Sequence, residues 1–140
     1  MAETVVLDTS AWIALDEKEP GADQVEALLA DAWLGQKELH GSFATLTELE
    51  YIRTQERDAQ QATELLAFVK SQPVKWHHTD DGLCSRAAKL KAAHKLSFAD
   101  AFIAATERLN ATLVHKDPEL EALKDVITLE LLPPKTGKLA

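Results

Sequence analysis

Four acidic residues of this chain stand where helices are expected to begin. They are Asp8, Glu48, Asp100 and Asp117. A carboxylate at such a position can cap backbone N–H groups, which is worth about 1 kcal/mol. Carboxylates that converge from several segments can instead bind Mg²⁺ or Mn²⁺ and support the hydrolysis of phosphate esters. The two interpretations differ in whether the four side chains meet.

Local patterns alone favour capping. Two pairs have the spacing of a capping box, in which an acid reaches back to the N–H group of the cap residue. These pairs are Thr45 with Glu48 and Ser97 with Asp100. Asp117 precedes Pro118, a combination that suits an N-cap followed by proline at the first helical position. Asp8 could cap a helix that begins near Ser10.

The arrangement of the expected elements changes this balance. Strands are expected at 4–7, 39–43, 73–78, 112–116 and 126–131. Helices are expected at 10–15, 22–34, 47–57, 59–70, 82–94, 98–109 and 118–124. Strands that alternate with helices predict an α/β fold in three layers, with a mainly parallel, five-stranded sheet covered on both faces.

This sheet would place the four acids at one edge. In open α/β sheets, functional sites lie beyond the carboxyl ends of the strands. Asp8 and Asp117 follow expected strands, and Glu48 lies about one turn into the helix after the second strand. If the strand at 112–116 is parallel to the first strand, it must begin at the opposite edge. The helix before it, which contains Asp100, must then run toward that opposite edge and begin at the edge where the other acids lie. We therefore expect Asp100 to join the other three.

Electrostatics decides what such a group can do. Two carboxylates about 6 Å apart repel by roughly 3 kcal/mol at an effective dielectric constant near 20. This exceeds the value of a cap, so converging carboxylates must take up protons or bind a cation. Oxygen ligands suit Mg²⁺ or Mn²⁺ rather than zinc. None of the five histidines has a zinc-like spacing, and His77 and His78 form a lone adjacent pair.

Length and composition set the broad class of protein. A chain of 140 residues fits one domain, which we expect at 1–132 with a flexible tail at 133–140. The net charge of -8 argues against RNA binding through bulk positive charge, although bound cations could supply that charge locally. The single cysteine fits a reducing compartment, and the sequence contains neither a membrane-length apolar run nor a signal pattern. We therefore expect a cytoplasmic protein without a membrane partner.

Basic residues cluster in one part of the chain. The densest group comprises Arg86, Lys89, Lys91 and Lys95. It can be a solvated helix face, or it can be a track for RNA phosphates beside the metal site. Arg53 and Arg57 could extend such a track.

The tryptophans also have two interpretations each. Trp12 and Trp33 suit internal packing or a dimer interface, where tryptophan is enriched. Trp76, on an expected edge strand, suits the core or a surface that stacks bases.

Four segments together resemble a known family. They read VVLDTSAWIAL, SFATLTELEYI, LSFADAFIAATERLNATLV and HKDPELEAL. Their order and spacing resemble the PIN domain, and most closely the small ribonuclease toxins of the virulence-associated protein C type, which occur in toxin–antitoxin pairs. The resemblance implies that the four acids hold Mg²⁺ or Mn²⁺ and cut RNA. It also implies a homodimer and a small antitoxin whose tail enters the site.

This chain departs from the family pattern near the fourth acid. The family often has Thr or Ser two positions before it, where this chain has His115. A second acid, Glu50, follows Glu48, but residues two apart do not share a helix face, so we expect Glu50 to lie outside the site.

The residues leave three functions open. The first is a metal-dependent endoribonuclease of the toxin type. The second is a catalytically silent binding module whose acids engage a basic partner. The third is a metal-dependent phosphatase of small phosphoesters, against which the lack of an Asp-x-Asp nucleophile pair near Asp8 counts.

Overall fold

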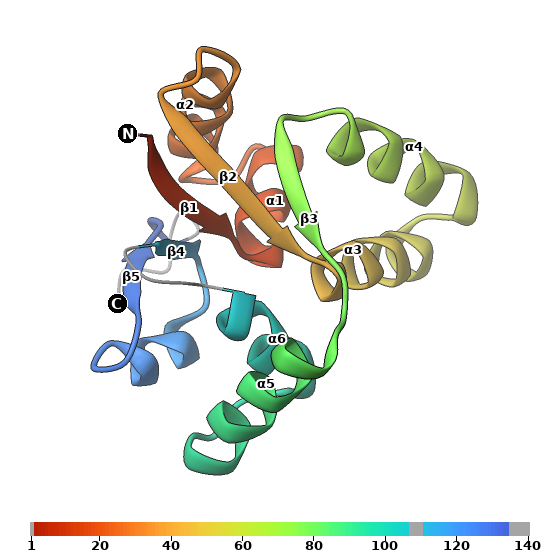
Figure 1. The fold of residues 1–140 in the computed structure, drawn as a ribbon. Helices are drawn as coiled ribbons and strands as arrows, with labels where there is room; N and C mark the ends of the chain where they lie inside the picture. The colour runs from red at the N-terminus through yellow and green to blue at the C-terminus, as the bar shows by residue number, and fades with distance from the viewer. Residues whose placement is uncertain (1, 107–110, 135–140) are drawn as a thin grey trace.

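The structure is a computed structural model that describes residues 2–106 and 111–134. Its sheet contains strands β1 (Glu3–Leu7), β2 (Lys37–Ser42), β3 (Val74–His77), β4 (Thr112–His115) and β5 (Thr128–Leu131). The strand order is β3-β2-β1-β4-β5, and every neighbouring pair is parallel (Figure 1). The expected five-stranded parallel sheet is confirmed.

Helices cover both faces of this sheet. The helices are α1 (Thr9–Asp16), α2 (Ala22–Trp33), α3 (Phe43–Glu56), α4 (Ala59–Lys70), α5 (Asp81–Ala93) and α6 (Phe98–Thr106), with a 3-10 helix η1 (Pro118–Leu123). Figure 1 shows α1 and α2 behind the sheet, α3 and α4 beside β3, and α5 with α6 below the front face. The α/β/α layering is therefore as expected.

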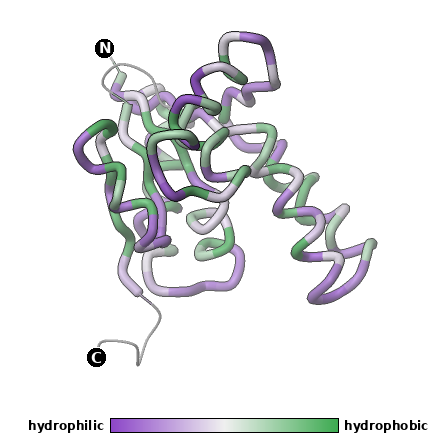
Figure 2. Tube along the Cα trace, turned by 90° about the horizontal axis from the view of Figure 1, so that it is seen from below, coloured by the Kyte–Doolittle hydropathy of each residue, from purple (hydrophilic) through white to green (hydrophobic). Residues whose placement is uncertain are grey.

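The alternation of side chains along β1 explains the two layers. Successive residues of a strand point to opposite faces. Val5 and Leu7 lie in the core beneath α1 to α4, whereas Val6 lies in the core beneath α5 and α6. All three are buried, so β1 is apolar on both faces, as a central parallel strand must be. Along the helices, hydrophobic and hydrophilic stretches alternate (Figure 2).

The start of α3 corrects one expectation. We expected the strand to continue to Phe43 and the helix to begin at Thr47, with Thr45 and Glu48 as a capping box. The helix instead begins at Phe43, and the Ser42 hydroxyl accepts a hydrogen bond from the Ala44 amide at 3.1 Å. Ser42 is therefore the cap, and the helix start is four residues earlier than expected.

Other boundaries differ by smaller amounts. The last helical segment, expected at 118–124, is the 3-10 helix η1. The expected end of the helix at 98–109 and residues 135–140 of the expected tail lie outside the described residues. Within the part of the chain that is described, no helix has the length and apolar character needed to cross a bilayer.

Strands β2 and β3 approach closely at one glycine. Gly41 pairs with Trp76, and a Cβ atom at Gly41 would overlap the Trp76 ring. The same ring stacks on Trp12 with centroids 6.0 Å apart. Trp12 is buried and Trp76 packs against the core beneath α1 to α4. Trp12 therefore packs internally, and Trp76 packs against the core rather than forming a surface that stacks bases.

Candidate functional site

Asp8 lies directly after β1 and caps α1. The backbone N–H of Ser10 donates to Asp8 Oδ2 at 3.0 Å, and the Ser10 hydroxyl donates to the same oxygen. The other carboxylate oxygen, Oδ1, is buried and has no hydrogen-bond partner among the described residues. Burial raises the pKa of the Asp8 carboxyl, and the nearby charge of Glu48 adds to this. One oxygen of Asp8 thus accepts two hydrogen bonds, while the other accepts none from the described residues.

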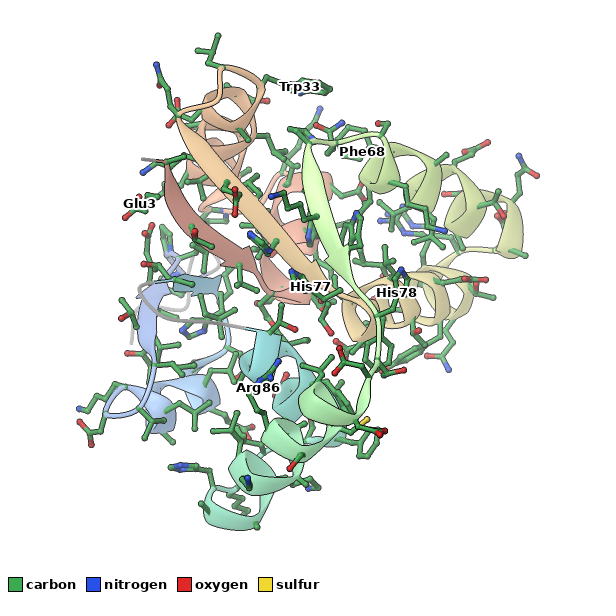
Figure 3. All side chains as sticks on the ribbon, in the orientation of Figure 1. Glu3, Trp33, Phe68, His77, His78 and Arg86 are labelled. Carbon is green, nitrogen blue, oxygen red and sulfur yellow. The ribbon has the colours of Figure 1, made fainter. Side chains whose placement is uncertain are left out.

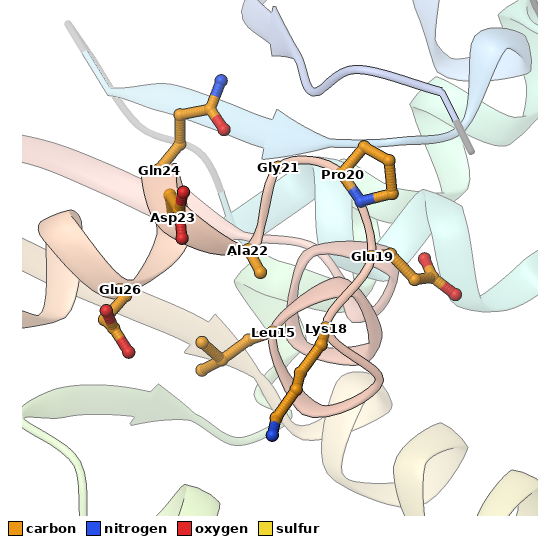
Figure 4. A pocket seen from close by; sticks show the side chains of 9 residues that line it. All are labelled: Leu15, Lys18, Glu19, Pro20, Gly21, Ala22, Asp23, Gln24 and Glu26. Carbon is orange, nitrogen blue, oxygen red and sulfur yellow. The ribbon is translucent and has the colours of Figure 1, made fainter. Parts of the chain in front are cut away.

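Ser10 also ties this position to β4. The backbone N–H of Lys116 donates to Ser10 Oγ at 2.8 Å. The Lys116 ammonium donates to the Pro20 carbonyl at 2.9 Å and pairs with Glu19 at 3.2 Å. Glu19 and Pro20 belong to the turn between α1 and α2, beside the pocket shown in Figure 4. These bonds fix the ends of β1 and β4 relative to each other.

Glu48 reaches the site from α3. The Thr9 hydroxyl donates to Glu48 Oε1 at 2.6 Å, and the hydroxyl oxygens of Thr9 and Thr45 are 3.1 Å apart. Thr45, expected as a cap, is fully buried and belongs to this hydroxyl network instead. Burial raises the pKa of the Glu48 carboxyl, the Thr9 bond opposes this, and the charge of Asp100 raises the pKa further.

Asp100 lies in the first turn of α6. Its backbone N–H donates to Ser97 Oγ at 3.1 Å, so the expected Ser97 cap is present. Burial raises the pKa of the Asp100 carboxyl to about 6, and repulsion by the carboxylates of Asp8 and Asp117 contributes. Because Asp100 also acts on Glu48, its charge couples to each of the other three acids.

Asp117 caps the 3-10 helix at the end of the β4 segment. Its Oδ1 accepts from the Glu119 backbone N–H at 3.0 Å, and Pro118 occupies the first helical position. Glu119 is a further acid whose charge acts on Asp100, and we did not expect it from the sequence. The sequence did offer one signal for Glu119: it lies in the first helical turn after Asp117, which was expected to be a cap at this edge of the sheet.

The structure thus brings the four expected acids to one edge of the sheet, close enough for their charges to repel. Three of the segments also show the expected capping bonds, so capping and convergence coexist. The side chains do not lie at coordination spacing: among residues 2–106 and 111–134, no group of three or more His, Cys, Asp or Glu side chains is placed to hold a metal ion. Their assignment as ligands stays a prediction. Glu50 is exposed on α3, as expected.

The arginines of α3 have acidic partners within the chain. Arg53 forms ion pairs with Asp16 and Glu17, and Arg57 pairs with Glu17 at 3.4 Å. These bonds join α3 to the end of α1. They favour a structural role over the suggested extension of a phosphate track.

Two members of the denser basic group bridge the α5–α6 region. Arg86, labelled on α5 in Figure 3, donates through Nε to the Ala105 carbonyl at 3.4 Å. The Lys91 ammonium donates to the Leu96 carbonyl at 2.8 Å. Among the tryptophans, Trp33 is 65% exposed at the end of α2 and stands apart from the body (Figure 3).

The geometry defines a class of protein: a three-layer α/β domain with carboxylates gathered beyond the ends of its parallel strands. The PIN domain model matches residues 5–126. The chain therefore belongs to the PIN domain family. A comparison with curated protein sequences finds no match.

Several solved structures of the same fold are toxin–antitoxin proteins. VapBC2 from Rickettsia felis, bound to a promoter DNA fragment, has a TM-score of 0.71 at 17% identity, over 93% of this chain and 99% of that one. VapC20 from Mycobacterium tuberculosis, a sarcin-ricin loop cleaving toxin, has a TM-score of 0.70 at 20% identity, over 92% and 99%. VapBC-1 from Haemophilus influenzae has a TM-score of 0.66 at 21% identity, over 91% and 97%. Identities this low show a shared fold.

Proposed function

We propose that this chain is a metal-dependent endoribonuclease and the toxin of a toxin–antitoxin pair. The observation that supports this most directly is the convergence of carboxylates from four separate segments at one edge. Burial, followed by the charges of Asp8 and Asp117, raises the pKa of the Asp100 carboxyl to about 6, so the proximity of the carboxylates adds to the free energy of the charged site. A helix cap gains nothing from a neighbouring carboxylate, so capping alone gives no reason for this arrangement.

The residues present fit a hard divalent cation. The donors are carboxylate oxygens, which Mg²⁺ and Mn²⁺ prefer. The buried Oδ1 of Asp8 lacks a hydrogen-bond partner among the described residues, and a bound cation would satisfy it. We assign the ligands as Asp8, Glu48, Asp100 and Asp117. When bound, the metal would polarise a phosphodiester and lower the pKa of a water molecule, so that hydrolysis needs no covalent nucleophile.

The neighbouring hydroxyls would keep the ligands oriented. Ser10 holds Oδ2 of Asp8 and leaves Oδ1 directed elsewhere, while Thr9 restrains Glu48. Outer hydrogen bonds of this kind hold metal ligands in place and affect metal affinity by about 10- to 100-fold. Among the described residues the carboxylates are not at coordination spacing. They repel one another, so they would have to rotate inward to bind a metal ion.

The partners follow from the same proposal. Several structures of this fold are complexes of a toxin with its antitoxin, and one of the toxins cleaves the sarcin-ricin loop. We propose an RNA substrate, a separate small antitoxin and a homodimeric toxin. We propose the cytoplasm as its location, because the proposed RNA substrate and antitoxin would be met there.

The test is RNA cleavage by the purified chain with Mg²⁺ or Mn²⁺. We expect cleavage that EDTA abolishes, and a loss of at least about 100-fold for Asp8→Asn or Asp100→Asn, because each removes one ligand charge. Glu50→Gln removes an equal charge from the exposed face of α3 and is expected to retain activity. Equal cleavage by the native protein and by both Asn variants would reveal a contaminating nuclease and contradict the proposal.

One observation favours the silent binding module as a second candidate. The carboxylates are not at coordination spacing, which also suits acids that engage a basic partner. In that case no preparation would cut RNA, while Asp100→Asn would weaken a complex with the partner. Faster hydrolysis of a chromogenic phosphoester than of any RNA would instead identify a phosphatase.

A further inference from the structure

His115 connects the fourth acid to the rest of the β4 segment. It is the last residue of β4, and its side chain is completely buried. The Asp117 backbone N–H donates to His115 Nδ1 at 3.0 Å. The other ring nitrogen, Nε2, lies 2.9 Å from Glu121 Oε2. Both nitrogens of a buried imidazole are therefore used, and both bonds involve the turn that carries Asp117.

The backbone donor determines which nitrogen of the ring carries the proton. A nitrogen that accepts from an N–H group must have a free lone pair, so Nδ1 is unprotonated. The proton of the neutral ring then lies on Nε2, which donates to the Glu121 carboxylate. A ring turned over by 180° could not make either bond with these partners. The two contacts thus define one orientation of the ring.

Asp117 is held at both ends by this arrangement. Its amide binds the ring, and its Oδ1 accepts from the Glu119 amide at 3.0 Å. The preceding amide, of Lys116, is bound to Ser10, which itself holds Asp8. The direction in which the Asp117 carboxylate leaves the backbone is therefore set by a chain of bonds that begins at the ring of His115.

We infer that His115 is a positioning residue, whose Nδ1 atom orients Asp117 toward the other three carboxylates, with Glu121 holding the ring from its far side. This inference rests on the proposed metal-binding function of the four acids. The ring also acts electrostatically on Asp8, but its hydrogen bonds are to the Asp117 amide and to Glu121, so the positioning effect passes through the Asp117 backbone. The role differs from simple packing because it depends on one particular ring nitrogen.

Two amide substitutions separate the two nitrogens. In His115→Asn, the side-chain oxygen takes the place of Nδ1 and can still accept from Asp117. In His115→Gln, the side-chain amide takes the place of Nε2 and can still reach Glu121, but the Asp117 acceptor is lost. Glutamine resembles histidine more closely in size than asparagine does. A packing role therefore predicts that His115→Gln is the milder change, and a positioning role predicts the reverse.

The first readout is Mn²⁺ binding, measured by calorimetry on the native chain and both variants. We expect affinity within about threefold of native for His115→Asn and at least about tenfold weaker binding for His115→Gln, the scale on which outer partners of metal ligands act. Glu50→Gln, at an exposed position outside the site, controls for the handling of variant proteins and should keep native affinity. Thermal unfolding in EDTA shows whether each variant is folded.

The second readout needs no metal. Hydrogen exchange of the Asp117 amide, measured by NMR in EDTA, reports directly on the bond to Nδ1. We expect protection to persist in His115→Asn and to be lost in His115→Gln. Protection of the Lys116 amide, which binds Ser10, serves as the internal reference and should persist in both.

The outcomes distinguish this inference from the proposed function. If the native chain binds Mn²⁺ and His115→Gln binds as tightly as His115→Asn, the inference is wrong while the proposed function stands. If the native chain binds no Mn²⁺, the proposed function fails. The exchange data then decide alone, and equal protection of Asp117 in the two variants would overturn the positioning role.

Discussion

Replacing Asp100 by asparagine is expected to stabilise the metal-free protein at neutral pH. The pKa of this carboxyl rises from 3.8 to about 6 on folding, so the folded chain holds the proton more tightly than the unfolded chain does. Between these two pH values the folded state binds more protons, and stability therefore falls as pH rises through the window. Asparagine resembles the protonated acid in shape and carries no charge at any pH. The stability of the Asp100→Asn variant should therefore not fall in this way as the pH rises.

The magnitude follows from the shift and from the position of the side chain. The full shift corresponds to about 3 kcal/mol of unfolding free energy. Asp100 is only half-buried, so solvent screens part of the repulsion, and we expect a gain of about 1–1.5 kcal/mol above pH 6. In a chain of this size the gain raises the melting temperature by about 3–6 °C.

The assay is chemical denaturation in EDTA at several pH values between 4 and 8. The native and Asp100→Asn curves should approach each other near pH 4, diverge as pH rises and run parallel above about pH 7. Glu50→Gln controls for the removal of one charge from an acidic protein, and its unfolding free energy should stay within about 0.5 kcal/mol of native. An Asp100→Asn variant that is less stable than the native chain at pH 7.5, or a stability difference that does not change with pH, would refute the reasoning.

Adding metal should reverse the order of the two proteins. A ligand at 100 times its dissociation constant stabilises a folded protein by about 2.7 kcal/mol. The native chain should gain this from Mn²⁺, whereas Asp100→Asn, which lacks one ligand charge, should gain much less. If Mn²⁺ stabilises both equally, Asp100 is not a ligand.

Two further substitutions test the packing around the site. Gly41→Ala is expected to lower the unfolding free energy by about 1–3 kcal/mol, because its methyl group would overlap the Trp76 ring; urea denaturation measures this, and native stability would contradict it. Thr9→Val keeps the shape of the side chain but removes the donor to Glu48, and should cost about 1–3 kcal/mol in the same assay. Unchanged stability of Thr9→Val at pH 7.5 would show that water replaces this bond.

The strands were predictable because each is a short run with a clear boundary. In β1 an unbroken apolar run stops at Asp8, which is typical of a parallel strand covered on both faces, and the structure shows that Val5, Val6 and Leu7 are buried. The start of α3 was not predictable in the same way. Ser42 and Thr45 are both suitable caps three residues apart, and local sequence does not choose between them. Thr45 lies inside the helix, where its hydroxyl contacts that of Thr9, 36 positions away in the sequence.

The edge that holds the acids was predictable from topology, whereas their partners were not. Strand ends and the direction of α6 placed Asp8, Asp100 and Asp117 together without any knowledge of side-chain geometry. The contribution of Glu119 depends on a 3-10 turn rather than a regular helix. The two bonds of His115 depend on burial and ring orientation, which residue type and spacing do not specify.

The bond between the Lys116 amide and Ser10 spans 106 positions and has a consequence for biosynthesis. Chains leave the ribosome from the N-terminus onward, so α1 to α4 emerge well before β4 has been translated. Until then β1 lacks one of its two neighbouring strands, and the fourth carboxylate does not exist. Nuclease activity of the proposed kind would therefore arise only after Asp117 has been made and β4 has joined the sheet.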